Sequence, residues 1–188
     1  MQPLRQSILD MEAIMSVADI YEKRSTFSFE VFPPKTDVGM EKLCGKDGVL
    51  DKLYTLEPDY ISCTYGAGGT NVGKNLEVLD KIQKDGKTIP VTHFTCIGNT
   101  KEDIKEKLQT YLDHGIDHML ALRGDLPFGW TGTNGDLHYA TELVKFVRKE
   151  FGDKFTIAVA GSPEGHIQCR SLEADIAFLQ QKQDNGAD

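Results

Sequence analysis

Short runs of β-favouring residues alternate with amphipathic segments along most of this chain. The first run, 26–32, puts Phe27, Phe29 and Val31 on one face and Glu30 on the opposite one, which is the two-residue period of a strand. Two prolines follow and end the strand, because proline has no N–H to give to a neighbouring strand. Glu30 therefore lies near the C-terminal end of a strand, where a carboxylate is costly to bury unless it has a partner or a chemical task.

A unit of one strand and one helix recurs along the chain. The predicted strands cover 26–32, 59–65, 89–96, 117–123 and 155–160, and the predicted helices cover about 40–56, 72–86, 100–114, 136–151 and 171–185. A leading helix is predicted over 8–23, before the first strand. This alternation is typical of an α/β fold built from parallel βαβ units. Because no low-complexity linker interrupts it, we expect residues 1–188 to form a single domain with βα units from residue 26.

Two architectures fit five βα units. One is a complete five-stranded flavodoxin-like sheet, and the other is the (β/α)8 TIM-barrel type, which takes about 250 residues and of which this chain would hold only five units. Pro58-Asp59 and Gly115-Ile116-Asp117 introduce the second and fourth strands, and Gly186-Ala187-Asp188 repeats this pattern where a sixth strand would begin. The repetition favours the barrel, with this chain as its N-terminal portion.

Composition and charge exclude several classes of protein. The net charge of -8 argues against a nucleic-acid binder, whose affinity depends on Lys and Arg. No apolar run approaches the ~20 residues of a membrane-spanning helix, and the N-terminus lacks the pattern of a signal peptide. The four cysteines are scattered without a CxxC pair, which favours free thiols in the reducing cytoplasm.

Candidate chemistry gathers where the predicted strands end, because active sites of parallel α/β folds lie at the C-terminal ends of the strands. The polar or ionisable residues there are Glu30, Thr64, Tyr65, His93, Arg123, Asp125, Glu164 and His166. Glu30 would be either a catalytic carboxylate or a structural ion-pair partner, for instance of Arg123. His93 would be either a ligand contact or a hydrogen-bonded packing residue. We expect no metal site, because His93 and Cys96 have no second ligand pair.

Two glycine-containing loops at these ends allow a ligand to approach the backbone. Residues 65–70 precede a helix and would either cradle a phosphate or form a plain turn, since they lack the P-loop lysine and the dinucleotide spacing. In Arg123-Gly124-Asp125, glycine lies between a cation and an anion. That pair would either grip a polar heterocycle or neutralise itself. The residues alone thus indicate a small-molecule α/β enzyme with a carboxylate acid or base.

Five stretches together resemble the methylenetetrahydrofolate reductase family. They are Ser28-Phe29-Glu30-Val31-Phe32-Pro33-Pro34-Lys35, Thr64-Tyr65-Gly66-Ala67-Gly68-Gly69, His93-Phe94-Thr95-Cys96, Ala121-Leu122-Arg123-Gly124-Asp125-Leu126-Pro127 and Pro163-Glu164-Gly165-His166. They follow the family's order from about residue 26 to the end of the chain. The resemblance implies a (β/α)8 barrel that carries FAD and serves one-carbon metabolism. Its reaction would reduce 5,10-methylenetetrahydrofolate to 5-methyltetrahydrofolate with electrons from NADH or NADPH.

The resemblance also assigns roles residue by residue. Glu30 would be the general acid that protonates a folate nitrogen, a task for a carboxyl that apolar surroundings keep protonated near neutral pH. Asp125 would lie beside the flavin and the folate, so that it binds cofactor and substrate and takes part in catalysis. Thr64 would contact the nicotinamide. The flavin-contacting positions would be Tyr65, Ala67, His93, Arg123, Gly124, Ala140, His166, Asp175 and Lys182. The implied partners are small molecules, with no nucleic acid or membrane and with room for a homo-oligomer.

The chain departs from the family pattern in three places. Ser162 stands where the family has a tyrosine, and Phe178 and Gln181 stand where polar and basic cofactor contacts are usual. Strands six to eight are not among these 188 residues, so we expect the chain alone to be poorly active. The alternatives are a non-catalytic or truncated flavin-binding fragment or partner subunit, and a five-stranded flavodoxin-like binding domain. Strand order would identify the last, and flavin content with NAD(P)H oxidation would separate the others.

Overall fold

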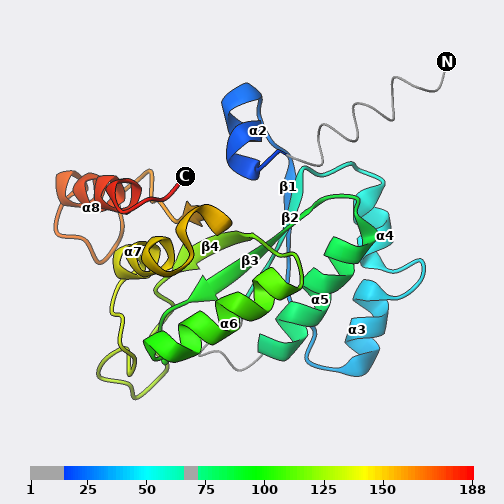
Figure 1. The fold of residues 1–188 in the computed structure, drawn as a ribbon, viewed down its shortest axis with the longest axis horizontal. Coiled ribbons are helices and arrows are strands. Elements are labelled where there is room, and N and C mark those ends of the chain that lie inside the picture. The colour runs from blue at the N-terminus through cyan, green and yellow to red at the C-terminus, as the bar shows by residue number, and fades with distance from the viewer. Residues whose placement is uncertain (1–14, 66–71) are drawn as a thin grey trace.

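Five parallel strands form one sheet in which neighbours along the chain are also neighbours in space. The computed structural model describes residues 15–65 and 72–188. The strands are β1 (Ser28–Val31), β2 (Tyr60–Cys63), β3 (Ile89–Thr95), β4 (His118–Leu122) and β5 (Thr156–Val159), in the order β1-β2-β3-β4-β5 (Figure 1). A flavodoxin-like sheet would have the order 2-1-3-4-5, so that alternative is wrong. The order confirms five βα units of the TIM-barrel type.

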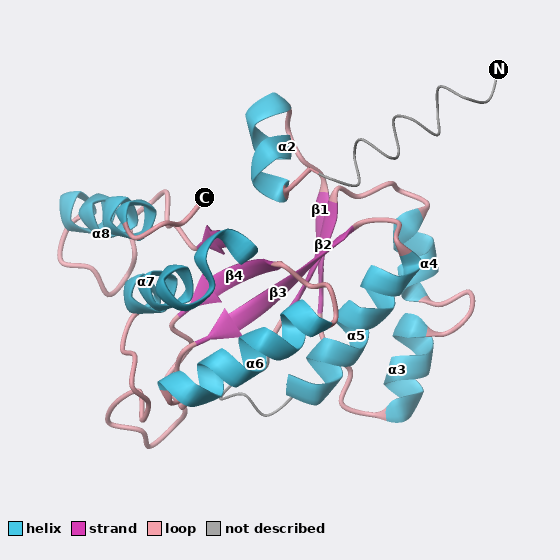
Figure 2. Cartoon of the chain, viewed as in Figure 1, coloured by secondary structure: helices cyan, strands magenta, loops and turns pink. Residues whose placement is uncertain are grey.

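Helices follow every strand. They are α3 (Asp37–Cys44) and α4 (Val49–Tyr54) after β1, α5 (Val72–Asp85) after β2, α6 (Lys101–Asp113) after β3, α7 (Ala140–Phe151) after β4 and α8 (Leu172–Asp184) after β5. A short helix, α2 (Val17–Lys23), precedes β1 and lies at the N-terminal end of the strands, away from the loops that follow them (Figures 1 and 2). None of these helices, within the part of the chain that the structure describes, is long and apolar enough to cross a lipid bilayer.

Two predicted helices differ from the observed ones for local reasons. The helix predicted over 40–56 is two helices, because the chain turns between Gly45 and Gly48 and Asp47 has a positive φ of 58°. Of the leading helix predicted over 8–23, residues 8–14 lie outside the described residues, and the observed helix begins only at Val17. Ser16 caps it, since its hydroxyl accepts from the Asp19 N–H and the Asp19 carboxylate accepts from the Ser16 N–H.

The core lies between the sheet and the helices α5, α6 and α7. Alternate strand residues such as Ile61 and Phe94 are fully buried there, as the strand period predicts. They pack with Leu79 of α5, Leu108 of α6 and Val147 of α7. Full burial of each such side chain stabilises the fold by about 1.5–3 kcal/mol. The intervening residues face the opposite side of the sheet, where the candidate site lies.

Two aspartates form reciprocal hydrogen bonds with the backbone of the preceding strand or of the segment that leads into it. The Asp59 N–H donates to the Phe27 carbonyl at 2.8 Å, and the Phe27 N–H donates back to the Asp59 carboxylate at 2.8 Å. Asp188 makes the same reciprocal pair with Ile157 of β5, at 3.0 and 2.8 Å. An arginine supports each carboxylate, Arg24 for Asp59 and Arg148 for Asp188. Asp188 therefore contacts β5 in the way that Asp59 contacts the segment leading into β1.

Candidate functional site

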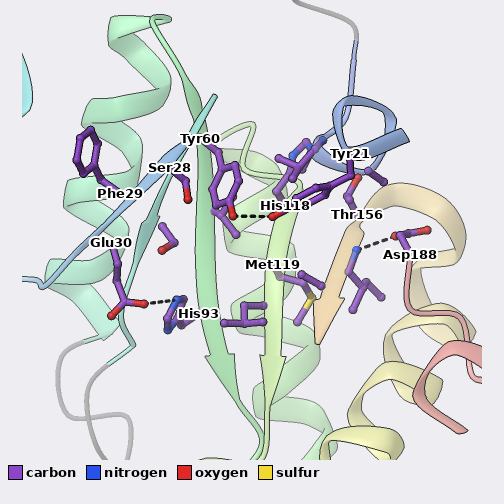
Figure 3. A pocket seen from close by; sticks show the side chains of 17 residues that line it. Tyr21, Ser28, Phe29, Glu30, Tyr60, His93, His118, Met119, Thr156 and Asp188 are labelled. Carbon is purple, nitrogen blue, oxygen red and sulfur yellow. Dashed lines mark hydrogen bonds and ion pairs between the residues drawn. The ribbon is translucent and has the colours of Figure 1, made fainter. Parts of the chain in front are cut away.

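A cavity of about 290 Å³ opens on the face of the sheet opposite α5 and α6 (Figure 3). All five strands and α2 contribute to its wall. Polar side chains enter it at every second strand position because they belong to the strand face that the core does not use. The lining polar residues are Tyr21, Ser28, Glu30, Tyr60, Ser62, His93, His118, Thr156 and Asp188.

The helix α2 closes the end of this cavity nearest the start of the strands. The Tyr21 and Tyr60 hydroxyls lie 2.8 Å apart, and the Val17 N–H donates to Nε2 of His118 at 3.2 Å. Because Nε2 accepts, the imidazole proton lies on Nδ1, which donates to Asp117 at 2.6 Å. These contacts hold α2 against the first residues of β2 and β4, and we call this end of the cavity its floor.

Glu30 and His93 meet nearer the C-terminal ends of the strands. Oε2 of Glu30 lies 3.4 Å from Nε2 of His93, as Figure 3 shows. The alternative partner considered for Glu30, Arg123, instead donates from Nε to the Gly124 carbonyl at 3.0 Å. Burial lowers the pKa of His93, and the Glu30 carboxylate partly offsets this by raising it. A lowered pKa favours the neutral imidazole beside the carboxyl group. We call this edge of the cavity, at the C-terminal ends of the strands and the loops that follow them, the rim.

The surroundings of Glu30 differ from the apolar ones that we expected. Its side chain is 48% exposed, while that of His93 is 12% exposed. Two aromatic residues close to it in the chain, Phe27 and Phe32, are themselves 50% and 68% exposed. Glu30 is therefore open to solvent on one side, and a molecule bound at the rim would have direct access to its carboxyl group.

The Glu30–His93 contact has a spectroscopic consequence. Glu30→Gln removes the negative charge that raises the pKa of His93, so we expect the pKa of His93 to fall further below its ordinary value of about 6.5. An NMR titration of the imidazole carbon-bound protons measures this directly, and Glu106→Gln on the exposed face of α6 is the matched control. An unchanged or raised pKa in Glu30→Gln would show that the two groups do not interact.

The loop after β4 is pinned to the end of β3. Gly124 has a φ of 91°, and a Cβ atom there would lie 2.5 Å from Cγ2 of Ile97 and 3.1 Å from Cβ of Thr95. Glycine is therefore required both for the backbone conformation and for the close approach. Arg123 beside it is half-buried and forms no ion pair within residues 15–65 and 72–188, and Asp125 is exposed.

Thr64 and Tyr65 leave β2 in different directions. The Thr64 N–H donates to the Val31 carbonyl at 3.0 Å, and its side chain is half-buried at the rim. The ring of Tyr65 is 2% exposed and packs against Phe94 in the core, with centroids 5.0 Å apart. A flavin contact of Tyr65 would therefore have to come from its backbone. Ala67 lies outside the described residues.

The remaining expected flavin contacts lie on α7, on α8 and in the loop before α8. Ala140 is the first residue of α7 and is half-buried. The His166 N–H donates to the Asp175 carboxylate at 2.8 Å, which leaves the imidazole exposed. Lys182 donates to the Ala160 carbonyl at 2.7 Å, and burial lowers its pKa. The side chains of Asp175 and Lys182 thus already form hydrogen bonds to the protein backbone.

The structure brings some of the predicted residues into contact and leaves others apart. Glu30 contacts His93, and His166 contacts Asp175, whereas no hydrogen bond among the described residues joins Asp125 to Glu30. Sequence reasoning missed the floor of the cavity, where Tyr60 and His118 begin their strands. The alternation of side chains along each strand could have found them, because both residues lie on the same face of the sheet as Glu30 and His93.

The rim suits a flavin in the chemistry of its groups. The Thr95 hydroxyl is buried beside Gly124 and has no hydrogen-bond partner among the described residues. The guanidinium of Arg123, which has no ion-pair partner among the described residues, follows in the same loop, and a cation there suits the polar edge of a flavin or its phosphates. No three His, Cys, Asp or Glu side chains gather as metal ligands within the described ranges.

Comparisons with known proteins give matches that cover most of the chain. A family model described as "Methylenetetrahydrofolate reductase" matches residues 14–188. The chain is 35% identical to "Methylenetetrahydrofolate reductase (NADH) 1" of Arabidopsis thaliana, over 95% of this chain and 32% of the relative. It is 36% identical to "5,10-methylenetetrahydrofolate reductase" of Pectobacterium carotovorum subsp. carotovorum, over 99% of this chain and 56% of the relative. The chain therefore spans about a third of the plant relative and just over half of the bacterial one.

A solved structure shares the fold without close sequence similarity. It is 2,3-dimethylmalate lyase, a PEP mutase/isocitrate lyase superfamily member, with a TM-score of 0.50 and 11% identity. The match covers 97% of this chain and 60% of that structure. At this identity the likeness concerns the arrangement of strands and helices alone.

Proposed function

This chain belongs to the methylenetetrahydrofolate reductase family, and on that premise we propose that it forms the N-terminal part of an enzyme that reduces 5,10-methylenetetrahydrofolate to 5-methyltetrahydrofolate. The electrons would come from NADH or NADPH through a bound FAD. The observation that carries the proposal is the Glu30–His93 pair, in which a solvent-accessible carboxyl group faces a neutral imidazole near the strand ends. A carboxyl group placed in this way could take a proton from solvent and pass it to a bound substrate, which opening of the methylene bridge requires.

Each group of the rim has a task in this proposal. When bound, FAD would accept hydride from the nicotinamide and pass it to the folate. Glu30 would hold a proton and deliver it to the folate nitrogen, and His93 would orient the carboxyl group through Nε2. Asp125 would bind the folate, and Arg123 would bind the polar edge of the flavin. Thr64 would position the nicotinamide, so that donor and acceptor use the same rim in turn.

The proposal extends to location and partners. All four cysteines are free thiols, which suits a reducing compartment, and we propose the cytoplasm. The expected partners are the folate and the nicotinamide nucleotide, and self-association into a homo-oligomer stays a prediction.

A second candidate function has its own support. Because the chain spans only 32% of the plant relative, it would alternatively act as a non-catalytic flavin-binding portion or partner subunit. The two candidates differ in turnover but not in fold.

Flavin content and reduction test the proposal. We expect the protein expressed from its full coding sequence to purify with FAD and to have that flavin reduced by NADH or NADPH without oxygen. We expect the 188-residue chain, assayed beside it, to turn over poorly. A colourless protein in both preparations would overturn the proposal, and a coloured protein that no nicotinamide nucleotide reduces would favour the second candidate.

A further inference from the structure

Asn75 is a fully buried amide on the face of α5 that packs against the sheet. Its side chain is 0% exposed, and it lies in line with Val78, Leu79 and Ile82, which are equally buried. These positions have the spacing of one helix face. A polar side chain on such a face is costly unless its hydrogen-bonding groups are satisfied.

The amide of Asn75 joins two strands and two helices. Nδ2 donates to the Cys63 carbonyl at 3.1 Å and to the Thr64 carbonyl at 3.0 Å, both at the end of β2. Oδ1 accepts from the Tyr111 hydroxyl of α6 at 2.6 Å. The Thr92 hydroxyl of β3 lies 3.3 Å from Oδ1 and 2.9 Å from the His93 carbonyl, and its single proton is shared between these two acceptors. Both donors and the acceptor are in use, so the amide has one orientation, and its donors point at the chain where it leaves β2.

The residue held in this way is Thr64. Its N–H is fixed by the Val31 carbonyl of β1 at 3.0 Å, and its carbonyl is fixed by Asn75. Two side chains of the described residues donate to this carbonyl, the Asn75 amide at 3.0 Å and the Cys63 thiol at 3.8 Å, and the amide makes the shorter contact. Both ends of Thr64 are thereby tied to elements that cannot shift without disturbing the core.

We propose that Asn75 is a positioning residue that holds Thr64 at the rim in the place from which it would contact the nicotinamide. The inference rests on the function proposed above for this rim. Asn75 itself touches no ligand and acts through the Thr64 backbone. A displacement of about 1 Å at such a contact can slow a reaction by roughly a hundredfold.

Two variants separate positioning from simple stability. Asn75→Leu keeps the size of the side chain and removes both donors to β2, and Asn75→Ala removes them with a smaller side chain if the leucine variant fails to fold. Tyr111→Phe is the matched control, because it removes one buried hydrogen bond to Oδ1 and leaves the Thr64 contact in place. Two readouts are compared, the hydrogen exchange rate of the Thr64 amide without ligand and the rate of flavin reduction by NADH or NADPH.

We expect the Thr64 amide to exchange at least about tenfold faster in the Asn75 variants than in Tyr111→Phe after correction for global stability. We also expect flavin reduction to slow by about tenfold to a hundredfold only in the Asn75 variants. Equal rates of Thr64 amide exchange in Asn75→Leu and Tyr111→Phe would overturn the inference, and so would equal rates of flavin reduction in these two variants. Wild-type protein without flavin would overturn the proposed function instead, and the exchange rate of Thr64, which needs no ligand, would still decide whether Asn75 holds this residue.

Discussion

Glu30→Gln should stop folate reduction while leaving flavin reduction intact. Glutamine keeps the size of the side chain but has no acidic proton to deliver, and general acid catalysis is worth about 10²–10⁴-fold. We therefore expect the transfer from reduced flavin to 5,10-methylenetetrahydrofolate to slow by about that factor. Reduction of the flavin by NADH or NADPH, which needs no proton from Glu30, should keep its rate. Anaerobic stopped-flow absorbance of the flavin measures the two half-reactions separately.

The control for this result is Glu106→Gln on the exposed face of α6. It changes the net charge by the same amount as Glu30→Gln, but away from the rim. If both half-reactions survive in Glu30→Gln, Glu30 is not the acid. If both are lost together while the protein stays folded, Glu30 contributes to flavin binding rather than to proton transfer.

Gly124→Ala should be among the most destabilising single-methyl changes in the chain. The φ of 91° strains any residue with a Cβ atom, and the new methyl group would lie 2.5 Å from Cγ2 of Ile97. Isoleucine is stiff at χ1, so that methyl group has little room to move. Backbone strain and overpacking each cost about 1–3 kcal/mol, so we expect the free energy of unfolding to fall by about 2–6 kcal/mol in urea denaturation.

Gly129 offers a matched control in the same loop. It has a φ of 85°, and an added Cβ would meet nothing within 4 Å. Gly129→Ala therefore carries the backbone strain without the clash and should cost about 1–3 kcal/mol. Equal losses of stability in the two variants would show that the loop moves away from β3, against the packing described above.

The strand period predicted much of this architecture and part of its site. Alternation along β1 placed Glu30 on the face that the core does not use, and the same parity in β3 places His93 on that face. The repeated βα unit predicted parallel strands, but it fitted two strand orders, and the structure separates them in favour of β1-β2-β3-β4-β5. The pairing of Glu30 with His93 did not follow, because contacts between neighbouring strands depend on register, which the sequence does not state.

The errors also have physical causes. Parity places Tyr65 with Ile61 and Cys63 in the core, as the structure shows, whereas the family resemblance suggested a flavin contact without saying which atoms make it. The helix predicted over 40–56 has apolar spacing throughout, and the break comes from the backbone freedom of Gly45 and Gly48. Asn75 was missed because a polar residue on an apolar helix face reads as an interruption until its partners are known.

We propose above that this rim transfers electrons from a bound flavin to a folate. Its most direct test is to mix the flavin-reduced protein, expressed from its full coding sequence, with 5,10-methylenetetrahydrofolate in the absence of oxygen. We expect the flavin to be reoxidised and one 5-methyltetrahydrofolate to form for each flavin. A flavin that stays reduced in the presence of this substrate would contradict it.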